Sequence, residues 1–373
     1  MLRRITLTAC TLIVAAPLAA LAATLEERVE ALERQNAELY HTLQEKEQAG
    51  LMTRITEKIS LSGLVEVEAG YESLGLKDGN DERSGDLVVS TAQLGFEAEV
   101  NDNVGATLIL LFEEDETEPI EVDEATVDYG RGPWQGRFGR QYVPFGAYPS
   151  HMISDPLTLE LGETRETAAL VGYEGEGWTV SAFVFNGDAE KVNGAGEPEE
   201  DHVKDWGVSA VVTPVEGLEV GASFVSDLAD TDADLLGGAG YAKRVGGWSA
   251  YAVAGWGAFQ VSGEVLGAVR AFDAADLDED ADGSGDRPLA WNVEGAWEVR
   301  QSVEVAARVE GSRELGGQPR VQYGVCVSWG VMEGVSVSAE YLHGEFDEDF
   351  GRDGDGNALD TRDLVTAQLA VEF

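Results

Sequence analysis

From residue 61 to the end of the chain, apolar and polar side chains alternate with a period of two. The alternation is clearest in the segments 61–71, 92–100, 303–310, 335–341 and 363–373. A period of two places the two sets of side chains on opposite faces of a β-strand, whereas an amphipathic helix repeats after three or four residues. Each segment is about ten residues long, which is the length of a tilted strand that crosses a bilayer.

The connections between these segments alternate between short and long. Tight turns are predicted at 101–103, 130–133, 174–177, 214–217, 300–301 and 330–334. Longer polar loops are predicted near 72–86, 113–120, 143–166, 187–203, 227–246, 271–287 and 345–361, with a brief member of this class at 312–318. A soluble sandwich would also alternate, but it would not separate short turns from long acidic loops. The pattern therefore predicts an all-β fold, a transmembrane antiparallel β-barrel of about 16 strands with both termini at the short-turn end.

A membrane barrel also accounts for the aromatic residue at the end of the chain. In hydrocarbon every backbone N–H and C=O needs a partner, so the last strand must pair with the first. Phe373 on the apolar face of that strand is typical of the signal read by the machinery that inserts outer-membrane barrels. We therefore predict that machinery, outer-membrane lipid and lipopolysaccharide as partners. Aromatic residues near strand ends suit two interfacial girdles: Tyr71, Trp178, Trp248, Trp297, Trp329 and Tyr341.

The first sixty residues follow other patterns. Residues 1–22 join Arg3 and Arg4 to an apolar run and a small-residue cleavage site, as in a cleaved secretory signal of a Gram-negative bacterium. Residues 23–50 are predicted to form a periplasmic coiled-coil helix, and residues 51–60 a linker to the barrel at 61–373. The predicted oligomerisation seam, which favours a homotrimer, is Leu25, Val29, Leu32, Asn36, Leu39 and Leu43. A single amphipathic helix lying on the barrel is the alternative.

The charge of the chain limits its partners. Loss of Arg3 and Arg4 with the signal would make the formal charge of -45 more negative by two, to about -47. Such a charge argues against nucleic acid and against anionic solutes. After residue 22 no apolar stretch reaches roughly 18 residues, which excludes a helical membrane protein. Cys326 would be left without a partner in the mature chain, so stability is not expected to rest on disulfides.

Catalysis finds little support in the sequence. The four histidines are His41, His151, His202 and His343, and none belongs to a Gly-x-Ser-x-Gly or His-Glu-x-x-His motif. We therefore predict that the protein is not an enzyme and has no cofactor.

One acidic loop resembles half of a calcium-binding loop. Asp278, Asp280, Asp282 and Asp286 have the spacing of its first ligands, with Gly283 at the sixth place. Leu289 stands where the twelfth position needs a bidentate glutamate. These aspartates are weak candidates for a Ca²⁺ or Mg²⁺ site that could bridge lipopolysaccharide phosphates. A solvated acidic loop is the interpretation we favour.

The loop at 143–166 is the best candidate for a pore constriction. Its apolar residues Met152, Ile153, Leu157, Leu159 and Leu161 need a surface to pack against, and the inner wall of the barrel would provide one. Charged side chains of the loop would then face the water path: His151, Asp155, Glu160, Glu163, Arg165 and Glu166. A loop that covers the barrel mouth without controlling flow is the alternative.

Three segments carry a resemblance to a known family. "FEEDETEPIEVDEATV" at 112–127, "GRQYVPFG" from residue 139 and "SDPLTLELGETRETA" ending at residue 168 resemble the LbtU-type siderophore porins. The resemblance covers most of the mature chain and is strongest from Gly63 to Asp188. It implies an outer-membrane protein that takes part in ferric-siderophore uptake, without the plug domain of energy-coupled receptors.

Three hypotheses about function follow. The first is a porin-like channel that passes a small solute, expected to be a ferric siderophore, by passive diffusion. The second is a general diffusion pore that prefers cations. The third is a structural barrel whose coiled coil tethers the envelope, although no recognisable wall-binding domain supports it.

Overall fold

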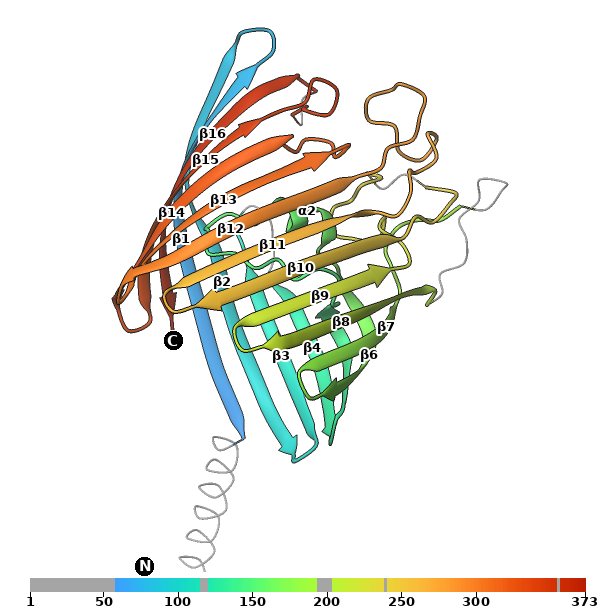
Figure 1. The fold of residues 1–373 in the computed structure, drawn as a ribbon, viewed down its shortest axis with the longest axis vertical. Coiled ribbons are helices and arrows are strands. Elements are labelled where there is room, and N and C mark those ends of the chain that lie inside the picture. Colours follow the sequence, from blue (N-terminus) through green and yellow to red (C-terminus); the bar gives the residue numbers. More distant parts are fainter. Residues whose placement is uncertain (1–57, 115–119, 193–202, 238–239, 354–355) are drawn as a thin grey trace, which may run out of the picture. The chain divides into compact units, whose positions relative to one another are not determined.

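The computed structural model describes residues 58–114, 120–192, 203–237, 240–353 and 356–373. In this part of the chain sixteen antiparallel strands form one closed barrel in which each strand pairs with its neighbours in sequence (Figure 1). The strands are β1 Ile59–Leu76, β2 Asp81–Asn101, β3 Val104–Phe112, β4 Glu121–Arg131, β5 Trp134–Tyr142, β6 Arg165–Gly175, β7 Trp178–Phe185, β8 Asp205–Val215, β9 Leu218–Val225, β10 Gly247–Trp256, β11 Phe259–Ala268, β12 Leu289–Arg300, β13 Val303–Arg313, β14 Val321–Met332, β15 Val335–Glu345 and β16 Leu359–Glu372. The predicted fold class and strand number are confirmed.

The barrel closes where β1 meets β16. These strands pair in one register from Leu64↔Glu372 to Gly75↔Thr361. Closure gives the edge groups of both strands their hydrogen-bond partners, as a sheet in hydrocarbon requires. Within the described residues, no helix has the length and apolar character needed to span a membrane. The signal at 1–22 and the coiled coil at 23–50 lie outside the described residues and stay predictions.

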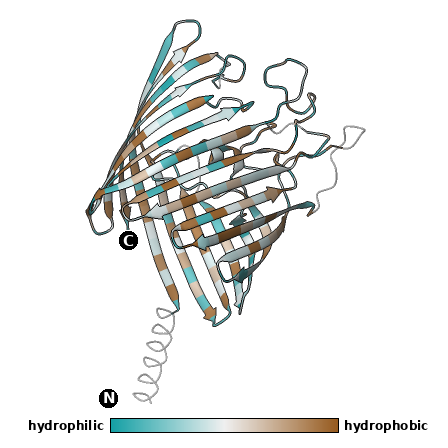
Figure 2. Ribbon diagram, viewed as in Figure 1, coloured by the Kyte–Doolittle hydropathy of each residue, from teal (hydrophilic) through white to brown (hydrophobic). Residues whose placement is uncertain are grey.

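The two faces of each strand meet different surroundings. On β14, Tyr323, Val325 and Val327 are 48%, 53% and 47% exposed on the outside of the barrel. The residues that alternate with them, Gln322, Gly324 and Cys326, are buried inside. Figure 2 shows this alternation of apolar and polar residues along the strands. An exposed apolar outer face is stable only in lipid, so the alternation that the sequence predicts is that of a membrane barrel.

Aromatic side chains gather near the short turns. Trp178, Trp297 and Trp329 of the predicted girdles are all at least 41% exposed there. Trp297 stacks on Phe259 with a centroid distance of 5.7 Å, and Trp178 stacks on Tyr173 at 5.5 Å. Amphipathic rings at this height suit the membrane–water interface.

The connections follow the predicted alternation with two differences. Residues 72–86 are a hairpin rather than a loop, because β1 and β2 continue to Leu76 and Asp81 and leave only residues 77–80 between them. Polar pairs such as Glu72↔Ser84 continue the ladder, since a strand that extends beyond the bilayer needs no apolar face. The structure also has a short turn at 257–258, between Trp256 and Phe259, which was not predicted from the sequence.

The connection between β5 and β6 leaves the wall and packs inside the barrel. It contains the helix α2 Leu157–Gly162, which contacts β11, β12 and β13. Leu157 and Leu161 are buried in the main apolar cluster together with Phe183 and Leu266 from the wall. Met152 and Ile153 pack against a second cluster, made of Ala296, Ala306 and Cys326. Four of the five apolar side chains that were expected to need an inner surface therefore pack on one, and Leu159 belongs to neither cluster.

Candidate pore constriction

Carboxylates on the inner wall hold the backbone of the loop. We call Glu264, Glu294, Glu304, Glu310 and Glu340 the wall carboxylates. Glu264 on β11 accepts hydrogen bonds from the N–H groups of Ala147 and Tyr148, both at 2.9 Å. Glu310 on β13 accepts one from Leu157 N–H at 2.8 Å. Charge-assisted bonds of this kind are stronger than neutral ones, so the start and the middle of the loop are firmly placed.

The same arrangement continues on β12 and β15. Glu294 accepts a 2.6 Å hydrogen bond from His151 N–H and a 3.1 Å bond from the Ser150 hydroxyl. Glu340 accepts bonds from the N–H groups of Ile153 and Ser154 at 2.7 and 3.2 Å. The backbone N–H groups of a loop have no ladder partner of their own, and burial would be costly without these acceptors.

Arg308 on β13 balances part of this negative charge. Its side chain is 1% exposed and forms ion pairs with Glu310 at 3.0 Å and with Glu294 at 3.7 Å. The guanidinium also donates 3.0 Å hydrogen bonds to the carbonyl oxygens of Ser154 and Asp155. A buried guanidinium needs acceptors on all its N–H groups, and the loop carbonyls complete the set that the wall begins.

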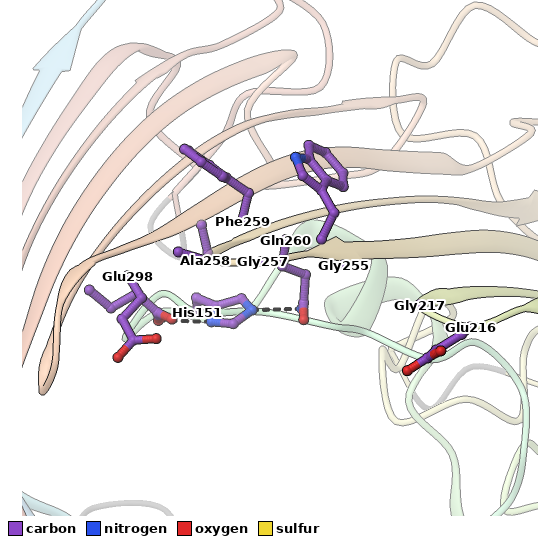
Figure 3. Close-up of a pocket in the computed structure, with 12 residues that line it drawn as sticks. His151, Glu216, Gly217, Gly255, Gly257, Ala258, Phe259, Gln260 and Glu298 are labelled. Carbon is purple, nitrogen blue, oxygen red and sulfur yellow. Dashed lines mark hydrogen bonds and ion pairs between the residues drawn. The ribbon is translucent and has the colours of Figure 1, made fainter.

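His151 lies deeper, toward the short-turn end of the barrel. Its Nδ1 is 2.8 Å from Glu304 Oε1, and its Nε2 is 2.7 Å from the Gln260 amide nitrogen (Figure 3). Because an amide nitrogen can only donate, Nε2 accepts and the Nδ1–H donates to Glu304. These residues line a cavity of about 500 Å³ together with Glu216 and Glu298. The cavity therefore has an acidic lining at the end where the turns are short.

The other predicted constriction residues occupy the second half of the loop and the start of β6. Asp155 and Glu160 are exposed to water, and Glu163 follows α2. Desolvation, then the charges of Asp232 and Asp155, raise the pKa of Glu163 to about 7, although the charge of Arg165 lowers it. A carboxyl group that titrates near neutral pH inside a channel can change the local field with small changes of pH.

Arg165 and Glu166 are held at the wall. Arg165 Nη1 lies 2.7 Å from Glu121 Oε1 and 2.8 Å from Asp123 Oδ1, both on β4. Glu166 pairs with Gln141 in the register of β5 and β6. The structure thus brings Glu163 and Arg165 together and places His151 in a separate group with Glu304. Their control of flow stays a prediction.

The wall carboxylates and Arg308 were not predicted from the sequence. These residues occupy the polar positions of alternating strands, for example Glu304, Arg308 and Glu310 in "VEVAARVEG". Lipid-facing positions of a membrane strand exclude charge, so a charged residue in such a strand is expected to face the lumen. Such a residue is therefore a candidate functional residue.

The predicted metal ligands are only partly gathered. One oxygen from each of Asp278, Asp280 and Asp286 lies within 4.8 Å of the others, whereas Asp282 is not in this group. Asp278 accepts hydrogen bonds from the N–H groups of Asp282 and Gly283 at 3.1 Å. The carboxylates thus act as caps for the turns of the loop, which agrees with the solvated loop that we favour. Metal binding at these residues stays a prediction.

Comparison with known proteins identifies the family. The sequence profile of the Gram-negative porins matches residues 9–349. The chain belongs to this family. It is therefore an outer-membrane, porin-like channel, and the family and fold are those of a channel rather than an enzyme.

Curated relatives are about a quarter identical to this porin over the aligned residues. A UPF0422 protein of Coxiella burnetii is 26% identical over 325 residues, which are 82% of this chain and 68% of that protein. A UPF0422 protein of Legionella pneumophila strain Lens is 25% identical over an alignment of 263 residues that covers 63% of this chain. The match spans about half of the Legionella protein, 48% of its length.

Solved outer-membrane proteins share the fold. The channel DcaP of Acinetobacter baumannii superimposes with a TM-score of 0.60 at 18% identity, over 84% of this chain and 97% of that one. OmpF of Salmonella typhi, in a complex with daunomycin, gives 0.60 at 12% identity over the same shares. A trimer form of OmpT of Vibrio cholerae gives 0.50 at 13% identity, over 84% and 99% of the two chains. At these identities the likeness concerns the fold alone.

Proposed function

We propose that this porin is a passive channel that prefers cationic and neutral solutes to anions. The observation that carries the proposal is the set of five wall carboxylates on the inner side of β11, β12, β13 and β15. In the described part of the chain, the guanidinium that forms ion pairs with them is that of Arg308. The formal charge of -45 for the whole chain has the same sign. An excess of negative charge between low-dielectric walls raises the local concentration of cations and selects solutes by charge.

Ion selectivity in planar bilayers tests this proposal. The reversal potential of the purified protein in a KCl gradient should show K⁺ permeating in preference to Cl⁻. Glu304→Gln should reduce that preference, because Glu304 is the least buried wall carboxylate, with a 35% exposed side chain beside the cavity. Glu333→Gln, in the exposed turn between β14 and β15, is the matched control. Preference for Cl⁻ in the unmodified protein would rule the proposal out.

A ferric siderophore is the second candidate solute. It is supported by the position of the resemblance, because the stretch from Gly139 to Ala168 contains the loop that the wall carboxylates hold. An acidic lumen would admit ferric complexes without net negative charge and would repel anionic ones. Transient blockade of single channels by a cationic ferric hydroxamate, but not by an anionic ferric catecholate, would support this candidate. Unchanged recordings with both would remove it.

A homotrimer is the assembly that we propose. The trimer form of OmpT has the same fold, and the seam Leu25 to Leu43 would supply the contacts between helices. Mass measurement of the detergent-solubilised protein should give three chains. Leu32→Asp, a charge in the centre of the seam, should shift the assembly toward single barrels if the helix joins the chains. Lipid, lipopolysaccharide and the insertion machinery stay the proposed envelope partners.

A further inference from the structure

Three buried aspartates meet at the long-loop end of the barrel. Asp205 begins β8, and Asp227 and Asp230 lie in the connection between β9 and β10. They are 5%, 0% and 5% exposed. One carboxylate oxygen from each lies within 4.8 Å of the other two. Negative charges at this distance repel one another strongly in the interior of a protein unless a cation or a proton neutralises them.

Arg244 supplies only part of the compensation. Its guanidinium lies 3.1 Å from Asp205 Oδ1 and 3.6 Å from Asp227 Oδ2. Three carboxylates and this one guanidinium leave a formal charge of minus two. The Tyr241 hydroxyl donates a hydrogen bond to Asp227 but adds no charge.

One oxygen of the group has no hydrogen-bond donor in the described part of the chain. Asp230 Oδ1 accepts a 3.1 Å hydrogen bond from Ala189 N–H, whereas no donor among the described residues reaches the buried Asp230 Oδ2. A Cβ atom at Gly187 would lie 2.0 Å from the Asp230 carboxylate, so only glycine leaves room for the carboxylate there. A buried acceptor without a partner costs about 1–3 kcal/mol, and more when it is charged, which calls for a missing ligand.

We propose that Asp205, Asp227 and Asp230 bind one divalent cation of the calcium type. The ligands are hard oxygens, which Ca²⁺ prefers, and two Ca–O bonds of about 2.4 Å can bridge oxygens 4.8 Å apart. The ion would cancel the remaining formal charge and give Asp230 Oδ2 its partner. The ion would link the start of β8 to the connection between β9 and β10. It would therefore stabilise the long-loop end of the barrel.

Protonation is the other process that can reduce the repulsion among these three carboxylates. Burial, then the charges of Asp205 and Asp227, raise the pKa of Asp230 to about 8. A proton on Asp230 would therefore replace the ion near neutral pH. Ca²⁺ would have to displace that proton. The experiment must therefore distinguish a bound cation from a proton on Asp230.

Thermal unfolding of the full chain in detergent tests the proposal. Protein treated with EDTA should unfold several degrees lower than protein with millimolar Ca²⁺, at equal ionic strength. Asp230→Asn should lose this response, because it removes the charge of the unpartnered oxygen. Asp280→Asn, in the acidic loop at 278–286, should keep the response. A Ca²⁺ response that survives in Asp230→Asn, or is absent from the unmodified protein, would overturn the proposal.

A second measurement does not depend on a variant that folds. Tb³⁺ bound at this site in the unmodified protein should be excited through Tyr241 and displaced by Ca²⁺ with one-to-one stoichiometry. Tyr241→Phe should lower the Tb³⁺ emission and leave Ca²⁺ stabilisation in place. Emission unchanged by Tyr241→Phe would place the ion elsewhere. If a proton alone occupies the group, no Tb³⁺ emission will be excited through Tyr241, and Ca²⁺ will not change the unfolding temperature.

Discussion

The Glu340 carboxylate on β15 accepts a 2.7 Å hydrogen bond from the backbone N–H of Ile153, which lies 187 residues earlier in the chain. The same carboxylate binds Ser154 N–H and its hydroxyl. A strand near the C-terminus therefore fixes the middle of a loop that enters the barrel after β5. The position of the loop therefore depends on contacts between residues that are far apart in the sequence.

Glu340→Ala should release this part of the loop. The change removes charge-assisted bonds worth about 1.5–3 kcal/mol each and leaves two N–H groups without acceptors. We expect lower stability to urea and larger, noisier single-channel currents. Ser338→Ala is the matched control, because Ser338 faces inward on the same strand and bonds Ser328 instead of the loop. Equal currents in the two variants would show that the loop does not limit conductance.

Arg308→Met should destabilise the barrel strongly. It leaves Glu294 and Glu310, which are 1% and 0% exposed, as buried charges without their cation. Breaking a buried pair from one side costs about 3–5 kcal/mol, and urea unfolding followed by tryptophan fluorescence measures it. Arg137→Met removes an exposed pair with Asp128, so it should cost at most about 1 kcal/mol. Similar losses for both would contradict the role given to Arg308.

The barrel itself was predictable because each strand meets lipid on one face and water on the other. Apolar and polar residues therefore alternate in each such segment, for example 335–341, and the alternation can be recognised in a single strand. The prediction of strands fails where a strand no longer has lipid on one face. Residues 72–86 extend past the bilayer, so both faces are wet and a paired hairpin reads like a loop. The turn at 257–258 was missed because the aromatic residues Trp256 and Phe259 enclose it.

The site was predictable only in part. The apolar residues of the loop showed that it needs an inner surface, and Leu157 and Leu161 find one. Its partners were not predictable, because no pattern within one strand tells whether Glu310 faces the loop or open water. Likewise Asp205 and Asp230 come from different connections, and only the fold brings them together.

Ion selectivity should depend on pH through Glu163. Its pKa is raised to about 7, so the side chain is mostly neutral at pH 6 and mostly charged at pH 8. The preference for K⁺ should therefore increase over this range. Glu163→Gln should weaken the increase, and reversal potentials at pH 6, 7 and 8 measure the difference. A pH dependence identical in both proteins would assign the effect to other groups, such as Asp286 with a pKa of about 6.

The same group predicts a stability effect of known sign. The folded pKa of Glu163 lies above its ordinary value of 4.5, so the folded state holds its proton more tightly than the unfolded state. Its contribution to stability is therefore present below pH 4.5 and is lost as the pH rises to about 7. Glu163→Gln cannot ionise, so relative to the unmodified protein it should gain stability as the pH increases from 5 to 8. The opposite trend in urea unfolding would show that the ionised carboxylate is favoured in the folded state.

Barrel closure should depend on the small size of Gly63. Gly63 and Phe373 exchange two backbone hydrogen bonds of 2.9 and 3.0 Å. A Cβ at position 63 would lie 2.3 Å from the Phe373 ring, which covers the glycine on the outer face. Gly63→Val should displace the ring and cost about 1–3 kcal/mol, as overpacking does.

Gly70→Val is its control, because nothing lies within 4 Å of a Cβ at that position of β1. Folding into lipid vesicles, followed by the shift in electrophoretic mobility on heating, should be slower for Gly63→Val than for Gly70→Val. Phe373→Ala should also fold slowly, since it removes both the ring and the predicted insertion signal. If Gly63→Val and Gly70→Val fold alike, the strand pairing closes the barrel without help from the ring, and the aromatic end of the chain serves recognition alone.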